Sequence, residues 1–137
     1  MTAATYDKPL PPPNEESRPF WEAMKEHRLV LQKCGACGKV RHYPRPVCDA
    51  CFSMDTEWME ASGKGQVHSW TISHHAFHPG FKGDLPLVLV IVDLDEGVRM
   101  CAQARDLDPE GLRIGLPVRV DFEDATDDLT LPVIRPA

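Results

Sequence analysis

Two Cys-x-x-Cys pairs, Cys34-Gly-Ala-Cys37 and Cys48-Asp-Ala-Cys51, constrain this chain of 137 residues more than any other feature. Each pair places two thiolates on one tight turn, and the ten residues between the pairs suffice for a hairpin that brings the turns together. Four sulfurs placed this way suit Zn²⁺, which takes a tetrahedron of ligands at about 2.3 Å in structural sites. The spacing therefore predicts a rubredoxin-like zinc ribbon, with the metal held by Cys34, Cys37, Cys48 and Cys51.

Four cysteine ligands leave no open position for water, so we expect a structural metal without chemistry of its own. Gly38 follows Cys37, where a metal knuckle commonly needs a positive φ that glycine adopts without strain. Phe52 stands at the matching place in the second knuckle, which must close differently or tolerate strain. Two disulfides or unrelated core cysteines are the alternative to a metal site, and a rubredoxin-type iron site is another.

Composition narrows the function classes. The formal net charge of −6 argues against a general nucleic-acid binder, which usually presents a basic surface. No apolar run approaches the ~20 residues that a membrane helix needs. The N-terminal stretch has no basic start followed by an apolar core, so we expect no secretory signal. Cysteines in metal spacing then favour a reducing cytoplasm.

The N-terminal part contains a proline-rich segment and an aromatic helix. Residues 1–13 end in Pro9-Leu-Pro-Pro-Pro13 and are expected to form an extended arm, either loose or lying along a partner protein. Residues 14–28 are expected to form a helix with Phe20 and Trp21 on its apolar stripe. These aromatics either cover the ribbon or barrel, or dock on another subunit, and both remain candidate partner-docking residues.

The helix and ribbon are expected to occupy residues 14–62, and a second domain residues 63–137, because the Gly-rich stretch 62–65 is typical of a boundary between modules. The second part is expected to be all-β, with a helical turn at Asp108-Pro-Glu110 after its third strand and with strands at 66–73, 85–94, 97–104, 116–124 and 129–134. Pro132 should confine the last strand to an edge or a bulge. This order predicts a mainly β chain with a five-stranded OB-fold barrel and a C-terminal tail; an SH3-like barrel is the alternative.

The order of these parts also resembles a known family. A short aromatic helix is followed by Leu29-Val-Leu-Gln-Lys-Cys-Gly-Ala-Cys-Gly38, Tyr43-Pro-Arg45, Gly63-Lys-Gly-Gln-Val-His-Ser-Trp-Thr71, Pro86-Leu-Val-Leu-Val-Ile-Val-Asp-Leu94 and Gly115-Leu-Pro-Val-Arg-Val120. Over about residues 16–125 this resembles the acyl-CoA-associated zinc-ribbon/OB-fold family, once named domain-of-unknown-function family 35. One departure is Glu26-His-Arg28, which fills a turn that the family often makes with glycine.

The resemblance implies an accessory, non-catalytic subunit that acts beside a thiolase-superfamily partner. That partner is a thiolase, a hydroxymethylglutaryl-CoA synthase complex or a retro-aldolase of side-chain degradation, as in lipid or steroid breakdown, and it supplies the catalytic residues. The small protein helps to hold the acyl-CoA thioester. Because thiolase-like enzymes are dimers, the resemblance implies a two-plus-two assembly.

Two groups of residues are candidates for binding acyl-CoA or the partner. The loop between the first two barrel strands, 73–84, carries Phe77, His78, Phe81 and Lys82 and is a binding loop or a plain exposed loop. Basic residues near the ribbon, Lys39, Arg41 and Arg45, are with Lys82 candidates for the phosphates of coenzyme A, with a solvated surface as the alternative.

Other residues that carry reactive chemistry point to no further site. His74, His75 and His78 lack an accompanying carboxylate or thiol, so we do not expect a second metal there. Cys101 lies in a predicted strand and is expected to be a buried barrel thiol rather than a nucleophile. A nucleic-acid-binding ribbon–barrel protein and an iron-type electron carrier remain the alternative functions.

Overall fold

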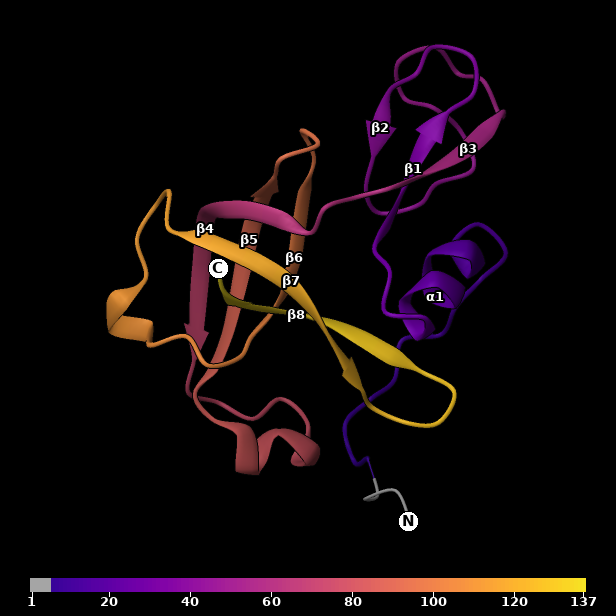
Figure 1. The fold of residues 1–137 in the computed structure, drawn as a ribbon. Helices are drawn as coiled ribbons and strands as arrows, with labels where there is room; N and C mark the ends of the chain where they lie inside the picture. The colour runs from indigo at the N-terminus through magenta and orange to yellow at the C-terminus, as the bar shows by residue number, and fades with distance from the viewer. Residues whose placement is uncertain (1–5) are drawn as a thin grey trace.

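The computed structural model describes residues 6–137, which form a small helix-and-ribbon unit beside a β-barrel (Figure 1). The elements are α1 (Arg18–Lys25), β1 (Val30–Cys34), β2 (Val40–Arg41), β3 (Thr56–Glu60), β4 (Lys64–Ser73), the 3₁₀ helix η1 (Pro79–Asp84), β5 (Leu87–Leu94), β6 (Arg99–Ala104), the 3₁₀ helix η2 (Pro109–Gly111), β7 (Pro117–Asp124) and β8 (Thr130–Pro136).

Helix α1 is shorter than the predicted range of 14–28 because the residues before it form a capping turn. The Asn14 amide donates to Ser17 Oγ at 3.0 Å, and the Ser17 amide donates to Asn14 Oδ1 at 2.9 Å. Pro19 lies in the first turn, where its missing N–H costs nothing. At the other end, His27 takes a φ of 57° and turns the chain toward β1. The buried face of α1 carries Phe20, Trp21, Ala23 and Met24.

The zinc ribbon is a three-stranded antiparallel sheet in the order β2-β1-β3. Strand β1 pairs with all five residues of β3, from Val30↔Glu60 to Cys34↔Thr56. Strand β3 was not predicted from the sequence. After the first knuckle the chain forms a strand only at Val40–Arg41, since Pro44 and Pro46 cannot donate to a ladder.

The second part is a closed five-stranded barrel in the order β4-β5-β6-β8-β7, with β4 also pairing with β7. All the barrel pairings are antiparallel except the short β6–β8 pairing. Helix η2 follows the third barrel strand, where Asp108 caps it through a 2.9 Å bond from the Glu110 amide. This arrangement confirms the OB-fold prediction.

Strand β8 is not an edge strand, because it lies between β6 and β7. Pro132 itself pairs only with β7, opposite Phe122, while the pairing with β6 begins one residue later at Val133. The prediction of an edge strand is therefore wrong, although Pro132 itself lies just outside the stretch of β8 that pairs with β6.

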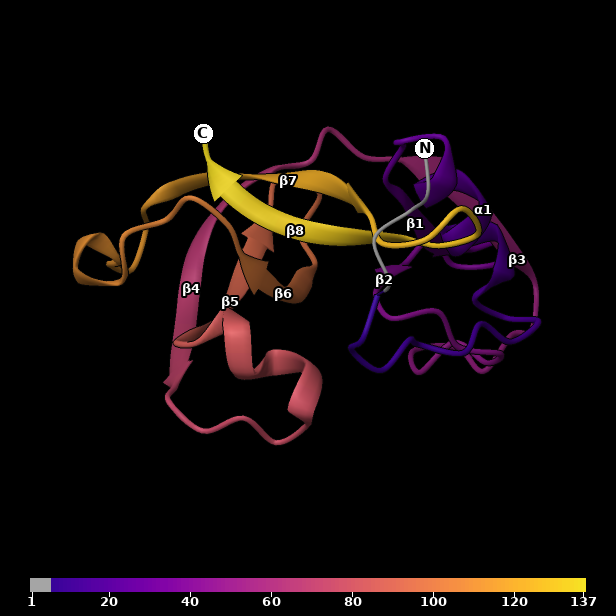
Figure 2. The same cartoon turned by 90° about the horizontal axis from the view of Figure 1, so that it is seen from below.

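One hydrophobic core runs from the inside of α1 into the barrel, where the ribbon and the barrel lie side by side (Figure 2). Val88, Val90 and Val92 of β5 point inward and are buried. The nearly continuous apolar run of residues 85–94 is typical of a strand buried on both faces, but Leu89 on the outer face of β5 is exposed. Within residues 6–137, no helix has the length and apolar character needed to cross a bilayer.

Candidate functional site

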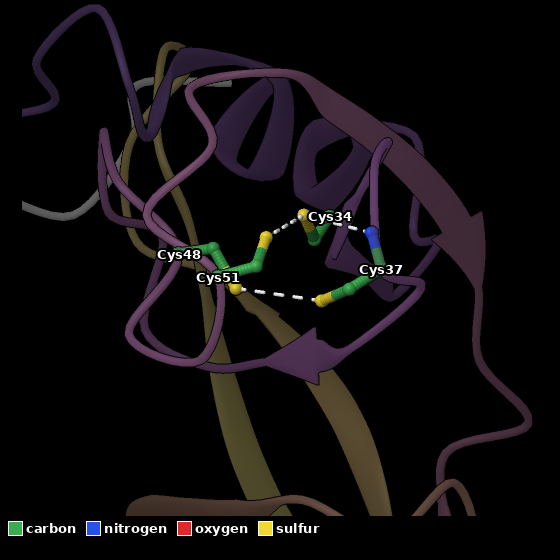
Figure 3. Close-up of side chains that lie close together, drawn as sticks. All are labelled: Cys34, Cys37, Cys48 and Cys51. Carbon is green, nitrogen blue, oxygen red and sulfur yellow. Dashed lines mark hydrogen bonds between the residues drawn. The ribbon is translucent and has the colours of Figure 1, made fainter.

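The four cysteines of the ribbon converge on one point (Figure 3). Cys34 Sγ lies 3.6 Å from Cys51 Sγ, and Cys37 Sγ lies 3.6 Å from Cys48 Sγ. All four sulfurs lie within 4.8 Å of one another. Four sulfurs bound at about 2.3 Å to one zinc in a tetrahedron would be about 3.8 Å apart. The donor set and its spacing therefore fit a structural zinc ion, and the chain has a zinc-ribbon domain.

Each knuckle also stabilises its first sulfur as a thiolate. Cys34 Sγ accepts from the backbone amides of Cys37 and Ala36, each at 3.4 Å. These amides lower the pKa of the Cys34 thiol to about 6. The amides of Cys51 and Ala50 likewise lower the pKa of Cys48. Thiolate is the form that binds metal, so the backbone prepares both knuckles for zinc.

The two knuckles close in the same way despite their different residues. The Gly38 amide donates to the Cys34 carbonyl at 3.0 Å, and the Phe52 amide donates to the Cys48 carbonyl at 2.9 Å. Gly38 has a φ of 80° and Phe52 a φ of 64°. Of the two possibilities that the sequence left open, the second knuckle therefore tolerates strain rather than closing differently.

A basic cleft of about 380 Å³ lies between the ribbon and the β5–β6 hairpin. It is lined by Lys39, Arg41 and Arg45, which were candidates from the sequence, and by Arg99, which was not. Two of these cations are paired, since Lys39 Nζ lies 2.8 Å from Asp49 and Arg99 Nε lies 2.8 Å from Asp93. The cleft therefore keeps two cations, Arg41 and Arg45, beyond those its carboxylates offset.

Arg41 is the buried cation of this cleft. The residue is only 5% exposed. Its Nε donates to Gln32 Oε1 at 2.7 Å, and its Nη2 donates to the Arg45 carbonyl at 3.1 Å. Both acceptors are neutral, and Nη1 has no hydrogen-bond partner within the described chain. Gln32 Oε1 also accepts from the Arg45 amide at 2.7 Å. Gln32 thus fixes both arginines, and the charge of Arg41 remains uncompensated.

Lys82 does not belong to the cleft. It lies in η1 before β5, whereas Arg99 follows the hairpin at the other end of that strand. Eight residues of β5 separate these ends by about 23 Å, at about 3.3 Å per residue. The sequence-predicted candidates therefore form two groups, one at the ribbon and one in the loop that carries Phe77, His78, Phe81 and Lys82.

Within the loop group, the side chains differ in what they contact. His78 Nδ1 accepts from the Gly80 amide at 3.0 Å and caps η1. Phe81 lies under the N-terminal arm, with Lys8 Nζ 5.7 Å from its ring centroid. Phe77 is exposed, and its ring lies edge-on to the ring of His75. Among residues 6–137, the four cysteines are the one group of three or more potential metal ligands whose ligand atoms lie close together.

The described part of the arm lies on the barrel of its own chain. Lys8 Nζ lies 3.7 Å from Asp84, and Asp84 accepts from Gln103 and Arg105 of the barrel. Gly80 lets the arm pass, because a Cβ at this position would lie 2.6 Å from the Asp7 carbonyl carbon. Asp7 and Lys8 of the arm therefore contact the barrel of their own chain; residues 1–5 are outside the described residues.

Two predictions need correction. Phe20 and Trp21 are buried, and Trp21 Nε1 donates to Tyr43 Oη at 2.8 Å, so these rings cover the ribbon and offer no exposed face for docking. Cys101 lies in β6 as predicted, but it points outward opposite Ile91 and is exposed. Its partial burial raises the pKa of its thiol, which opposes a nucleophilic role.

The chain matches known proteins that have a zinc ribbon and an OB-fold domain. The ChsH2 rubredoxin-like zinc ribbon model matches residues 21–57, and the ChsH2 C-terminal OB-fold model matches residues 58–123. A solved chain of the "Ltp2-ChsH2(DUF35) aldolase" is 42% identical, with a TM-score of 0.84 over 93% of this chain and 98% of that chain. A Sulfolobus solfataricus protein of the DUF35 family, 16% identical with a TM-score of 0.62, shares the fold.

Curated relatives include subunits and scaffolds. A probable enoyl-CoA hydratase alpha subunit of Thermomonospora curvata is 42% identical over 95% of this chain, and a 3-oxo-4,17-pregnadiene-20-carboxyl-CoA hydratase alpha subunit of Mycobacterium tuberculosis is 37% identical over 79%. The chain spans only 40% and 34% of the lengths of these two proteins. A DUF35 domain-containing scaffold protein of Methanocaldococcus jannaschii is 33% identical, over 79% of this chain and 77% of that protein. The chain therefore belongs to the DUF35 family of zinc-ribbon/OB-fold proteins.

Proposed function

We propose that this chain is a non-catalytic accessory subunit, which binds a thiolase-superfamily enzyme acting on an acyl-CoA and helps to hold that acyl-CoA. The relatives support the coarser part of this proposal, because they are subunits of hydratase and aldolase complexes and scaffold proteins. Two of them are named as hydratases of a CoA thioester, which supports acyl-CoA as the ligand class.

The observation that carries the ligand proposal is the cleft between the ribbon and the β5–β6 hairpin. It gathers four cations on a chain whose formal net charge is −6. Arg41 and Arg45 have no carboxylate partner there, within the residues that the structure describes. Coenzyme A carries a diphosphate and a 3′-phosphate, and guanidinium groups bind phosphate with paired, directed hydrogen bonds. We assign the phosphates to this cleft.

We assign the residues of the loop group to a second contact, which is with the partner or with the acyl part of the ligand. Phe77 is 80% exposed, and it sits on the loop between β4 and η1. Exposed aromatics on ordered loops are favoured anchors for ligands and partners. We propose that Phe77, with His78, Phe81 and Lys82, faces the partner or the acyl part of the ligand. A two-plus-two assembly with a dimeric partner completes the proposal.

Affinity purification of the tagged chain from its native cell tests the partner. Recovery of a thiolase-superfamily protein in equal molar amount supports the proposal, and its absence under conditions that preserve complexes contradicts it. The mass of the isolated complex by light scattering then decides between a two-plus-two assembly and any other stoichiometry.

Calorimetric titration of the complex with unesterified coenzyme A tests the cleft. Reversal of charge at both exposed arginines, Arg45→Glu with Arg99→Glu, should weaken binding at least ten-fold, because two phosphate-binding cations become repulsive. Arg113→Glu is the matched control, since Arg113 is exposed and lies outside the cleft. Equal affinities for the double variant and the control would contradict the assignment of the phosphates.

A further inference from the structure

We propose that the second zinc knuckle carries a protein-docking anchor, Phe52, whose ring inserts into an apolar pocket with a basic rim on the partner enzyme. The identity of that partner rests on the function proposed above. The position of the anchor rests on backbone conformation, exposure and charge around the loop Cys48–Ser53.

The backbone at Phe52 is in the left-handed region, with a φ of 64°. Bulky residues rarely adopt this conformation, because Cβ crowds the neighbouring carbonyl oxygen. Gly38 closes the first knuckle with the same hydrogen bond and without that strain. A glycine at position 52 would therefore serve the zinc site better. The benzyl group contributes nothing to closing the turn.

The side chain of Phe52 also gains little from packing, since the residue is 78% exposed. Two further apolar residues accompany it. The Cys48 amide donates to the Ser53 carbonyl at 2.9 Å, and this bond brings Val47 and Met54 to the two sides of the base of the loop. Both are exposed, Met54 to 72%. We call Val47, Phe52 and Met54 the knuckle patch. Aromatic and methionine side chains are enriched in the cores of protein–protein interfaces.

The charge around the knuckle patch selects its occupant. Asp55 and Glu57 follow the patch along the chain, are exposed and form no ion pair within the described residues. A cleft of about 280 Å³ adjoins Met54, and its charged lining residues are Glu15, Glu16 and Arg45. Lys33 lies opposite Glu57 in the ribbon sheet. With four carboxylates against two cations, the border of the patch is net acidic, and a complementary surface offers Lys and Arg around an apolar pocket.

A second copy of this chain does not fit the patch. A two-fold symmetric pairing would set the same patch against itself and bring the two acidic borders together. Like charges facing each other across an interface oppose association. The occupant is therefore a different protein, and within the proposed complex it is the thiolase-superfamily subunit.

The test combines stability with recovery of the partner. Phe52→Asn removes the ring and introduces a residue that adopts positive φ more readily. We expect this variant to keep its zinc, to melt no lower than the wild-type chain and to recover at least ten-fold less partner in affinity purification from the native cell. Ile114→Asn is the matched control, because Ile114 is also 78% exposed but lies outside the knuckle patch. It should recover the wild-type amount.

A substitution that reverses a charge beside the knuckle patch tests the docking surface independently of Phe52. Asp55→Lys should lower partner recovery at low salt by at least three-fold, and the difference from wild type should shrink at high salt. Wild-type recovery by Phe52→Asn would overturn the docking inference and leave the proposed function intact. Loss of zinc or a lower melting temperature in Phe52→Asn would assign the ring a structural role and overturn the inference as well. Failure of the wild-type chain to recover any thiolase-superfamily protein would overturn both.

Discussion

His27 Nε2 lies 2.9 Å from Asp124 Oδ1, and the imidazole ring stacks on Phe122 with 5.2 Å between ring centroids. His27 ends the turn after α1, while Phe122 and Asp124 belong to β7. The pair therefore joins the helix-and-ribbon part to the barrel through side chains, at the place where the chain takes a positive φ of 57°. This is also the turn where the sequence departs from the glycine that resembling proteins often carry.

Replacement of His27 by Asn should lower the free energy of unfolding by about 1 kcal/mol, since it removes a stacked pair and an exposed hydrogen bond to Asp124 while keeping a residue that tolerates positive φ. Urea unfolding measures the change. His74→Asn is the control, because His74 is an exposed loop residue. Equal destabilisation by the two substitutions would mean that the His27 contact contributes nothing.

Zinc should be a condition for the ribbon to fold. We expect one zinc ion per chain, a colourless protein, and loss of hydrogen-exchange protection in β1 and β3 when a chelator removes the metal, because the four cysteines alone cannot hold the two knuckles together. Cys101→Ser should keep the full zinc content, whereas Cys48→Ser should not. Iron with visible absorption, or an unchanged melting curve after chelation, would contradict this prediction.

Because His42 is buried, its protonation should lower the free energy of unfolding as the pH falls from neutral to 4. Burial lowers the pKa of His42 to about 4 from the ordinary value of 6.5. Between these two values the unfolded chain binds more protons than the folded chain, so stability present at neutral pH is lost as pH falls from 6.5 toward 4. The loss is at most about 3 kcal/mol at about 1.4 kcal/mol per pKa unit.

His42→Phe separates this effect from protonation of the zinc thiolates. Denaturant titrations at pH 7 and pH 4.5 should show a smaller drop in stability for the variant than for the wild-type chain. Parallel drops in both proteins would show that His42 is not the group responsible.

Gly80→Ala should release the arm from the barrel. The added methyl group would collide with the backbone of Asp7, 2.6 Å from its carbonyl carbon, and backbone cannot move aside as a side chain can. Gly83→Ala is the matched control in the same 3₁₀ helix, since its Cβ would meet nothing within 4 Å. Limited proteolysis within residues 6–13 should be faster for Gly80→Ala alone. Equal cleavage rates in the two variants would contradict the role of Gly80.

The zinc ribbon and the barrel were predictable from local pattern. Cysteine spacing specifies a ligand set directly, and alternation in β6 and β7 follows the inward residues Met100, Ala102, Val118 and Val120. Strand β3 was missed because Thr56–Glu60 has no alternation, and it becomes a strand only by pairing with β1. The pairing with β1, rather than the local sequence preference of this segment, therefore makes it a strand.

The basic cleft was predictable only in part. Lys39, Arg41 and Arg45 lie close in sequence to the cysteines, so their grouping followed from the chain itself. Arg99 joins them because the β5–β6 hairpin packs beside the ribbon, a long-range contact that no local pattern encodes. Phe20 and Trp21 were candidate docking residues because the sequence could not show that Tyr43 and His42 cover them.

Turnover of an acyl-CoA thioester by the purified chain, by its partner and by the reconstituted complex tests the central claim most directly. The account predicts no turnover by this chain alone, and at least ten-fold faster turnover by the complex than by the partner alone. Acyl-CoA turnover by the isolated chain, or a partner whose rate and affinity for its substrate are unchanged by the chain, would contradict it.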